Sequence, residues 1–341
     1  MTGRRATGVP AAAQPAPQAV LSASVSHALF LVVTVDEGGE ARVRHLLTKL
    51  AGLVRATGSR APEGHLSCVA AVGSDAWDRL FAGPRPARLH TLREIEGRRR
   101  AVSTPGDLLF HIRASRSDLC FELAAELMGF LRRAVTVCDE VVGFKYFGER
   151  DLLGFVDGTE NPTGEAACAA VLVGDEDAPF ACGSYVLVQK YLHDLDGWNA
   201  LPVEAQERAI GRAKVTNIEQ DSGEQAPNSH VALNKVLAPD GTEQRILRCN
   251  MPFGSAARGE FGTYFIGYAR SPVVIEQMLR NMFLGKGPSG HDRILDFSAP
   301  VTGTLFFAPS ATFFDGLPEP PDAGSDSASL RIGSLRRSPS V

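Results

Sequence analysis

Residues 108–146, LLFHIRASRSDLCFELAAELMGFLRRAVTVCDEVVGFKY, contain a strand–helix–strand pattern that decides the fold. Leu108–Arg113 is an apolar run of strand length. Ser117–Ala134 places its apolar residues on one helical face, and Ser117 or Asp118 can cap the first turn. Val135–Tyr146 then predicts a second strand.

The same alternation extends in both directions from this segment. Upstream, His27–Val35 and Leu66–Val72 predict strands on either side of a helix at Glu40–Arg55, and a further short helix is expected near Asp75–Phe81. The first half therefore has the order β-α-β-β-α-β. The second half repeats this order, with elements expected at Ser184–Leu192, Pro202–Gly211, Arg245–Met251, Thr263–Ala269, Pro272–Phe283 and Leu305–Ala308. Two such units predict an α+β protein with a duplicated ferredoxin-like fold of the dimeric α+β barrel type and antiparallel sheets.

Composition changes at both ends of the chain. Residues 1–25 are rich in Ala, Pro and Gln, and residues 316–341 are rich in Pro, Ser, Ala and Gly. Such segments cannot bury enough apolar surface to fold, so both are expected to be disordered tails. Between them we expect a first ferredoxin-like domain at 26–150 and a second at 151–315.

The overall composition argues against several classes of protein. A chain of 341 residues with 44% hydrophobic residues can bury a sizeable core, and a net charge of −4 without a Lys/Arg-rich run argues against nucleic acid as the main partner. No apolar run reaches the length of a membrane span, and the residues after Arg4 and Arg5 lack the apolar core of an export signal. The six cysteines form no CxxC pair, which argues against a zinc ribbon or c-type haem and suits a reducing cytosol.

Three short segments carry residues suited to chemistry. They are GFVDGTENP at 154–162, NSHVALN at 228–234 and ILRCNMPFG at 246–254. By composition alone, the first favours a turn. A lone histidine such as His230 is more often structural than a metal ligand, and Arg248 has an ordinary reading as the partner of a surface carboxylate.

Together, these segments resemble the dye-decolourising peroxidase family. Residues 154–162 match its GxxDGTxNP signature, and His230 stands in its SHxxxN context. The resemblance covers residues 27–315 and is nearest to the compact bacterial B-type subgroup, which lacks an export signal. It implies two ferredoxin-like domains, with one haem b per chain held mainly by the second. The implied enzyme reduces hydrogen peroxide through a ferryl intermediate, oxidises dyes, phenolics or Mn(II), and forms dimers or hexamers.

The resemblance also implies a role for each main candidate. His230 is expected to be the proximal ligand of the haem iron, with Arg248 on the opposite, distal face and Asn250 beside it. Asp157 suits proton transfer between the two oxygens of peroxide, because an ionised carboxylate can take up a proton and return it. Arg248 stays charged, so it is expected to stabilise the departing hydroxide, and Asn250 to orient peroxide or a water.

Further residues complete the expected haem site. The second ring nitrogen of His230 should donate to a carboxylate, for which Asp292 is the candidate, with Asp296 behind it. Arg212 follows a predicted helix and suits either a haem propionate or the helix dipole. Thr263 and Phe265 are expected to line the pocket, although either also fits a core strand.

Two routes are open for the reducing substrate. Glu160, Glu219 and Glu243 lie in or beside these segments. If their carboxylates gather at the haem edge, they would suit Mn(II) as a reducing substrate. The alternative is that all three are solvated glutamates. Bulky dyes cannot enter a small distal pocket, so they would react at the haem edge or at a surface radical. The candidates for such a radical are Tyr191, Trp198 and Trp77.

The C-terminal tail contains a short motif of its own. Ser329–Ser338, SLRIGSLRRS, resembles the cargo-loading peptide of encapsulin nanocompartments. Leu330, Ile332 and Leu335 would be its apolar anchors on an extended, tethered segment. The alternative is a chance apolar patch in a tail. We therefore expect a cytoplasmic protein held inside an encapsulin shell.

Two other functions fit parts of this pattern. A haem-handling protein, for storage or for deferrochelatase-like removal of iron, would share His230 but would not need Asp157 and Arg248 together on the other face. A small-molecule binder without haem gives no reason for all three residues. The Asp–Arg pair therefore favours the peroxidase.

Overall fold

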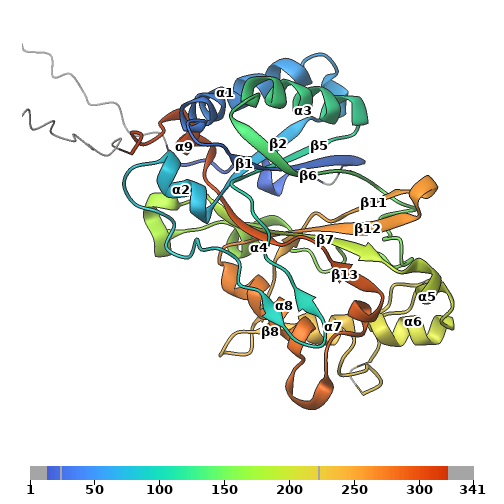
Figure 1. The fold of residues 1–341 in the computed structure, drawn as a ribbon. Helices are drawn as coiled ribbons and strands as arrows, with labels where there is room; N and C mark the ends of the chain where they lie inside the picture. Colours follow the sequence, from blue (N-terminus) through green and yellow to red (C-terminus); the bar gives the residue numbers. More distant parts are fainter. Residues whose placement is uncertain (1–13, 24, 222, 322–341) are drawn as a thin grey trace, which may run out of the picture.

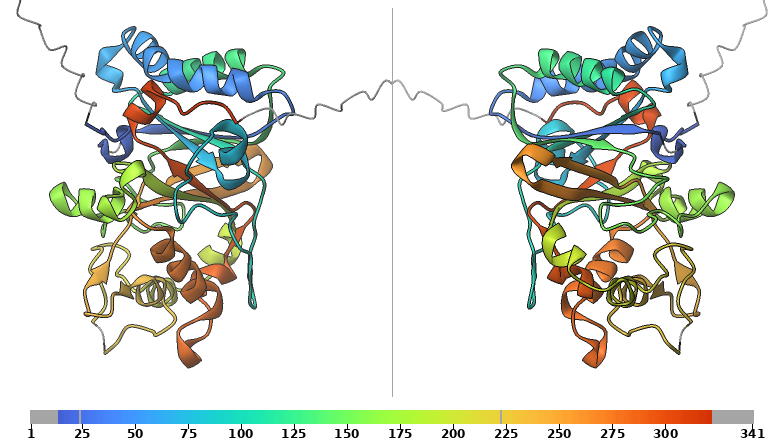
Figure 2. Two further views of the ribbon diagram at one scale, coloured as in Figure 1. Left: turned by 90° about the vertical axis from the view of Figure 1, so that its left-hand side faces the viewer. Right: turned by 90° about the vertical axis from the view of Figure 1, so that its right-hand side faces the viewer.

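The computed structural model describes residues 14–23, 25–221 and 223–321 of the chain. Helices cover the two outer faces of the molecule, and the strands lie between them (Figure 1). The same layers are visible from both sides in Figure 2. Within the described part of the chain, none of the helices has the length and apolar character needed to cross a membrane.

The two halves of the chain have the same topology. The first unit consists of β1 (His27–Val35), α1 (Glu40–Gly58), β2 (Ser67–Gly73), β5 (Leu108–Ala114), α3 (Ser117–Leu131) and β6 (Val135–Phe144). The second consists of β7 (Ser184–His193), α6 (Val203–Ile210), β10 (Leu247–Arg248) with β11 (Met251–Ser255), β12 (Glu260–Ala269), α8 (Pro272–Leu284) and β14 (Thr304–Ala308). Their strand orders are β2-β5-β1-β6 and β10-β12-β7-β14, so each half has its first strand between its third and fourth. The predicted duplicated ferredoxin-like fold is confirmed.

Shorter elements decorate this framework. The helices are α2 (Ser74–Leu80), α4 (Gly164–Val171), α5 (Leu195–Asn199), α7 (His230–Asn234) and α9 (Ala311–Asp315). The strands are β3 (Ile95–Glu96), β4 (Arg100–Ala101), β8 (Val236–Leu237), β9 (Glu243–Gln244) and β13 (Ser298–Pro300). β14 also pairs antiparallel with β2, and this pairing joins the two units into one sheet.

Among the described residues, three of the four buried apolar clusters follow from strand alternation. Residues such as Phe30 and Val69 of the first unit pack against Val188, Tyr264 and Ile266 of the second, so the two halves of the sheet share an inner core. A second cluster lies between the first unit and its helices α1 and α3, and a third lies under α8. Each fully buried large apolar side chain contributes about 1.5–3 kcal/mol to stability.

The expected disordered N-terminal tail is wrong for residues 14–23. Ala19–Leu21 form a 3-10 helix, and Val20 is buried in the inner core. The Gln18 amide explains the ordering, because its Nε2 donates to Ala70 O and its Oε1 accepts from Ala70 N. At the other end, residues 316–321 are also placed, and Ala82 N donates to Glu319 O. The remainder of the predicted C-terminal tail, with the Ser329–Ser338 motif, lies outside the described residues.

The strand expected at Arg245–Met251 is interrupted. β10 ends at Arg248, and β11 begins at Met251. Between them, Asn250 Oδ1 accepts a hydrogen bond from Ile266 N at 3.0 Å, so a side chain replaces a backbone partner in the ladder. The interruption turns the Asn250 side chain toward the second unit's cavity, where its amide reaches Asp157.

Candidate active site

A cavity lies between the outer face of the second half-sheet and the helices α6, α7 and α8. Alternate residues of β7 and β12 form one wall, and α8 forms much of another with Ile275, Met278, Leu279 and Met282. Three described segments that are distant in sequence bring polar groups to it: the 151–160 loop, the start of α7 and the end of β10. All three motifs identified in the sequence therefore meet at one cavity.

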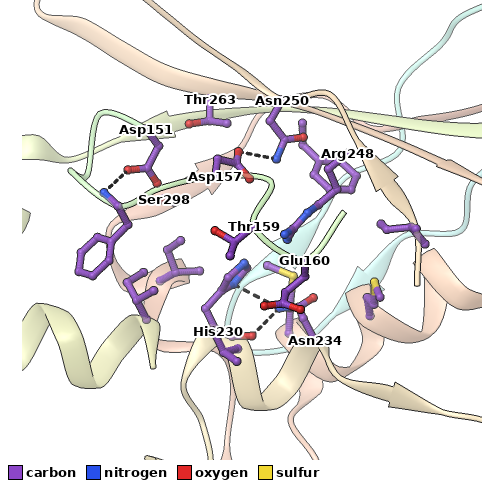
Figure 3. Close-up of a pocket in the computed structure, with 18 of the residues that line it drawn as sticks. Asp151, Asp157, Thr159, Glu160, His230, Asn234, Arg248, Asn250, Thr263 and Ser298 are labelled. Carbon is purple, nitrogen blue, oxygen red and sulfur yellow. Dashed lines mark hydrogen bonds between the residues drawn. The ribbon is translucent and has the colours of Figure 1, made fainter. Parts of the chain in front are cut away.

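His230 is the first residue of the short helix α7. The buried Ser229 caps this helix by accepting a hydrogen bond from Ala232 N. His230 Nδ1 lies 2.7 Å from Oδ2 of Asp292, which is fully buried and is held in turn by Ile294 N. Because an ionised carboxylate only accepts, Nδ1 donates, and the lone pair is on Nε2. Figure 3 shows the His230 ring extending from α7 toward Asp157 and Arg248.

Asp157, Arg248 and Asn250 lie together across the cavity from His230 (Figure 3). Asn250 Nδ2 donates to Asp157 Oδ2 at 2.8 Å, and Gly158 N donates to Asp157 Oδ1 at 2.6 Å. Among the described residues, the Arg248 guanidinium has no hydrogen bond or ion pair. Asn250 was expected to orient peroxide, but both ends of its amide are used to connect Asp157 with β12.

Asn161 positions the motif loop on the sheet, a role that its local sequence did not predict. Its Oδ1 accepts from Arg248 N at 2.9 Å, and its Nδ2 donates to Arg248 O at 2.8 Å. The side chain thus pairs with β10 as a neighbouring strand would. The Asn-Pro end of the motif is therefore what holds Asp157 near Arg248. Gly158 has a φ of +74°, which a side chain there would strain.

Asp151 is a cavity residue that the sequence did not single out. Its Oδ1 accepts from Phe155 N at 2.9 Å. Burial, together with the nearby charge of Asp157, raises the pKa of the Asp151 carboxyl to about 7. An acidic residue in a polar turn is common. The only indication of Asp151 in the sequence is therefore its position just after the strand predicted at 135–146.

Asp151 should make folding stability depend on pH. The folded protein holds this proton up to about pH 7, whereas the unfolded chain releases it near 3.8, so stability falls as pH rises between these values. The change is up to about 4 kcal/mol. We expect Asp151→Asn to remove this loss, measured as urea unfolding at pH 5 and pH 8. Asp196→Asn, at an exposed aspartate, is the control, and an equal pH dependence in wild type and Asp151→Asn would contradict the assignment.

His193 is a second histidine that lines the cavity. His193 Nδ1 is 2.8 Å from Ser298 Oγ, and its Nε2 is 2.9 Å from Thr263 Oγ1. Burial lowers the pKa of His193 to about 4, so the ring is neutral at neutral pH. Thr263 and Phe265 both line the cavity, as expected. His193 was taken for an ordinary histidine, because nothing near it in the sequence indicates the pocket.

The expected Mn(II) carboxylates are paired with basic residues instead. Arg212 Nη2 donates to Glu160 and lies 3.3 Å from Glu219 Oε2, and Arg245 lies 3.1 Å from Glu243 Oε2. Across the described ranges, no group of three or more His, Cys, Asp or Glu side chains is arranged for a metal ion. These pairs do not test manganese binding, so the assignment of Glu160, Glu219 and Glu243 to Mn(II) stays a prediction. Arg212 is buried, and its Nη2 already has Glu160 and Glu219 as partners. Its expected contact with a haem propionate stays a prediction.

Two other expectations need correction. Trp77 and Trp198 are 0% exposed and Tyr191 is 8% exposed, so none is a surface site for dye oxidation. Asp296 does not lie behind Asp292, because its carboxylate contacts His291 and Arg293. In contrast, Arg245, Asn234 and Lys235 line the cavity without having been singled out.

The residues present fit a haem. The lining is mostly apolar, with a single carboxylate-anchored imidazole on one side and acid, guanidinium and amide groups on the other. In addition, the buried Gln189 Nε2, which faces this cavity, has no hydrogen-bond partner among the described residues. A planar, mostly apolar group whose iron takes an imidazole nitrogen would suit this donor set. The class defined by fold and site is thus a duplicated ferredoxin-like protein with a histidine-anchored cofactor pocket.

Comparison with known proteins identifies the family. Family models described as Dyp-type peroxidase, N-terminal, and Dyp-type peroxidase, C-terminal, match residues 17–145 and 148–313. A dye-decolorizing peroxidase of Mycobacterium tuberculosis is 56% identical, covering 95% of this chain and 98% of the relative. The chain belongs to the Dyp-type peroxidase family and is a peroxidase.

Two solved structures are similar over almost their whole length. The encapsulated DyP-type peroxidase from Mycobacterium smegmatis has a TM-score of 0.89 and 56% identity, covering 90% of this chain and 100% of that chain. A DypB variant from Rhodococcus jostii RHA1, in complex with heme, has a TM-score of 0.87 and 52% identity, covering 89% and 99%. The heme complex of this relative confirms the predicted type of cofactor.

Proposed function

We propose that this peroxidase holds haem b in the cavity, where His230 would bind the iron, and that it reduces hydrogen peroxide on the side of the cavity formed by Asp157 and Arg248. The observation that carries the proposal is the placement of the His230–Asp292 pair across one cavity from these two residues. When bound, haem supplies the iron that binds peroxide and takes up its oxidising equivalents.

Asp157 is the proton carrier of the distal face. It takes the proton from one peroxide oxygen and delivers it to the other, so that the leaving oxygen departs as water. Asn250 is a positioning residue, because its Nδ2 holds Asp157 Oδ2 while its Oδ1 is anchored to β12. The amide therefore fixes the direction in which the second carboxylate oxygen, Oδ1, faces.

Arg248 stabilises the negative charge that develops on the departing oxygen. Its guanidinium is uncompensated by any described carboxylate, so its full charge is available in the cavity. On the opposite face, Asp292 accepts the Nδ1 proton of His230 and increases the electron donation of the ring to a metal. This arrangement favours peroxide chemistry over simple haem storage, which requires His230 alone.

An absorption spectrum tests the proposal. The protein reconstituted with haemin should show a ferric Soret band that changes within milliseconds of adding one equivalent of hydrogen peroxide. Bound haem without a spectral change would support the haem-handling alternative. No bound haem would overturn both functions.

We also propose that the chain is cargo of an encapsulin shell in the cytoplasm and that dyes, phenolics or Mn(II) are its reductants. The similar Mycobacterium smegmatis protein is described as encapsulated, and this supports the interpretation of Ser329–Ser338 as a loading peptide. Its anchors Leu330, Ile332 and Leu335 can dock in apolar pockets of a partner. Dimers or hexamers remain a prediction from the family resemblance.

The tail should be required for loading. A variant that ends at Ala328 is expected to lose co-assembly when it is produced together with the shell protein, because all three anchors are removed. Its haem content and peroxidase activity should be unchanged. Size-exclusion chromatography followed by gel analysis of the shell fraction measures the loss. Arg336→Ala/Arg337→Ala, which keeps the anchors, is the control, and retention of the shortened variant in the shell fraction would refute the motif.

A further inference from the structure

A buried tyrosine–histidine pair lies on the other side of the active-site sheet. Tyr268 of β12 and His111 of β5 are both 0% exposed, and the Tyr268 hydroxyl is 2.7 Å from His111 Nδ1. The two rings are stacked, with centroids 6.0 Å apart. Phe30 of the same inner core also stacks on both sheets' rings, with its ring centroid 4.8 Å from that of His111 and 4.1 Å from that of Tyr264.

The hydrogen bond runs from the phenol to the imidazole. His111 Nε2 is buried and has no partner among the described residues. If Tyr268 donates to Nδ1, only the Nε2 proton is left without a partner. If Nδ1 donates instead, both Nε2 and the phenolic proton lack one, and each unsatisfied buried group costs about 1–3 kcal/mol. An orphaned buried polar atom needs an explanation, and a redox role is one that fits this pair.

Both groups are held in the protonation states that this donor–acceptor pair requires. Burial and the neighbouring Arg113 hold the pKa of His111 well below its usual value, so the imidazole is a free acceptor. Burial raises the pKa of Tyr268 well above its usual value, so the phenol keeps its proton. Returning the proton to Tyr268 is favoured, because an imidazolium beside Arg113 is unfavourable.

Tyr268 differs from the other tyrosines of the chain. All five tyrosines lie in the described ranges, and of these only Tyr268 is hydrogen-bonded to an imidazole. Tyr191 donates to the Gln189 amide, and Tyr185 accepts from Arg88 N. Tyr264 is on the same strand and the same buried face, but no hydrogen bond to its hydroxyl is found among the described residues.

The pair lies one strand layer from the active site. Tyr268 is opposite Leu247, and Gly267 is opposite Arg248, which lines the cavity. Successive side chains of a strand point to opposite faces, so Phe265 faces the cavity while Tyr264 and Tyr268 face the inner core. The phenol is thus close to the site of oxidation but shielded from substrate and solvent.

We propose that Tyr268 and His111 form a redox-active site that holds one oxidising equivalent in the interior of the protein. This inference rests on the proposed haem peroxidase function. One electron passes from the Tyr268 phenol to the peroxide-oxidised cofactor, while the phenolic proton moves to His111 Nδ1. The products are a neutral phenoxyl radical and an imidazolium, and one electron from a reductant, with return of the proton, restores both groups.

Such a site matches the stoichiometry of the reaction. Peroxide removes two electrons at once, whereas phenolic and dye reductants supply them one at a time. A buried, reversible carrier keeps the second equivalent away from oxidisable groups until a reductant arrives. The phenolic proton can move without a water molecule, because its acceptor, His111 Nδ1, is already hydrogen-bonded to the Tyr268 hydroxyl.

The test uses the haem-loaded full chain, mixed with hydrogen peroxide without reductant and frozen for electron paramagnetic resonance. The wild type should give a tyrosyl radical whose hyperfine pattern narrows when the protein contains ring-deuterated tyrosine, and whose high-field g-values report a hydrogen-bonded phenoxyl. Tyr268→Phe should lose this signal, and the control Tyr264→Phe should keep it. Both variants should retain the millisecond Soret change.

The outcomes separate this inference from the proposed function. No Soret change in the wild type would overturn the peroxidase itself. A normal Soret change with no tyrosyl radical, with a radical that is unchanged in Tyr268→Phe, or with equal loss in Tyr264→Phe would overturn the Tyr268–His111 site alone. If Tyr268→Phe fails to fold, the g-values of the wild-type radical still decide, because a radical without a hydrogen bond cannot be this pair.

Discussion

His230→Ala is expected to lose most of its bound haem. The imidazole is the one side chain of its kind that faces the cavity with a free ring nitrogen among the described residues, since His193 is engaged at both of its nitrogens. Removing it leaves apolar contacts but no iron ligand. The measurement is the Soret absorbance per chain after purification and after titration with haemin.

Two further variants sharpen this prediction. Asp292→Asn keeps the ligand but weakens its hydrogen bond, and loss of such a partner typically costs about 10–100-fold in metal affinity. His193→Ala changes a histidine of the same cavity that has no expected iron contact, so its haem content should stay close to that of the wild type. Exogenous imidazole should restore part of the Soret band in His230→Ala. A full Soret band in His230→Ala without added imidazole would show that another group holds the haem.

Asp157→Ala and Arg248→Leu should both react slowly with hydrogen peroxide while they still bind haem. Loss of a positioned proton carrier typically costs about 10²–10⁴ in rate. Loss of a charge-stabilising donor typically costs about 10²–10³. Stopped-flow absorbance under pseudo-first-order peroxide measures the rate constant directly, separately from oxidation of the reductant.

The neighbouring residues provide the comparison for these variants. Asn250→Ala should have a smaller effect than Asp157→Ala, because it releases the Asp157 carboxylate without removing it. Glu160→Gln alters the same loop at a residue paired with Arg212, and its rate should stay near that of the wild type. Rates equal to the wild type in both Asp157→Ala and Arg248→Leu would remove these residues from the chemistry.

Local sequence was sufficient for the main architecture. The run from Leu108 to Tyr146 has strand and helix periodicities that tertiary contacts only reinforce, so its elements could be predicted. The second half of the chain repeats this order of strands and helices, so its elements could be predicted in the same way. The two half-sheets accordingly have the same strand order. The ends of the elements were less predictable. Between β10 and β11 the ladder is interrupted because the Asn250 side chain, and not a backbone carbonyl, accepts from Ile266 N.

The chemistry of the site was also visible in part. Asp157, His230 and Arg248 are found in motifs with unusual local patterns, and these patterns do not depend on what surrounds them. Asp151 and His193 have no such pattern, and the pKa of each is shifted mainly by burial, which exists only in the folded chain. Likewise, the glutamates that seemed suited to Mn(II) are neutralised by Arg212 and Arg245, which contact them only in the folded chain.

The amino-acid sequence by itself determined the duplicated fold, the family and the three residues on which the peroxide chemistry is proposed to depend. Tertiary structure alone decided which groups those residues contact: Asp292 for His230, Asn250 for Asp157 and no described carboxylate for Arg248. The same is true of Tyr268 and His111, which are separated by 157 positions and meet only when the two half-sheets pack. The physical reason is that periodicity and motifs are local properties, whereas burial, hydrogen-bond partners and pKa depend on chain segments that only folding brings together.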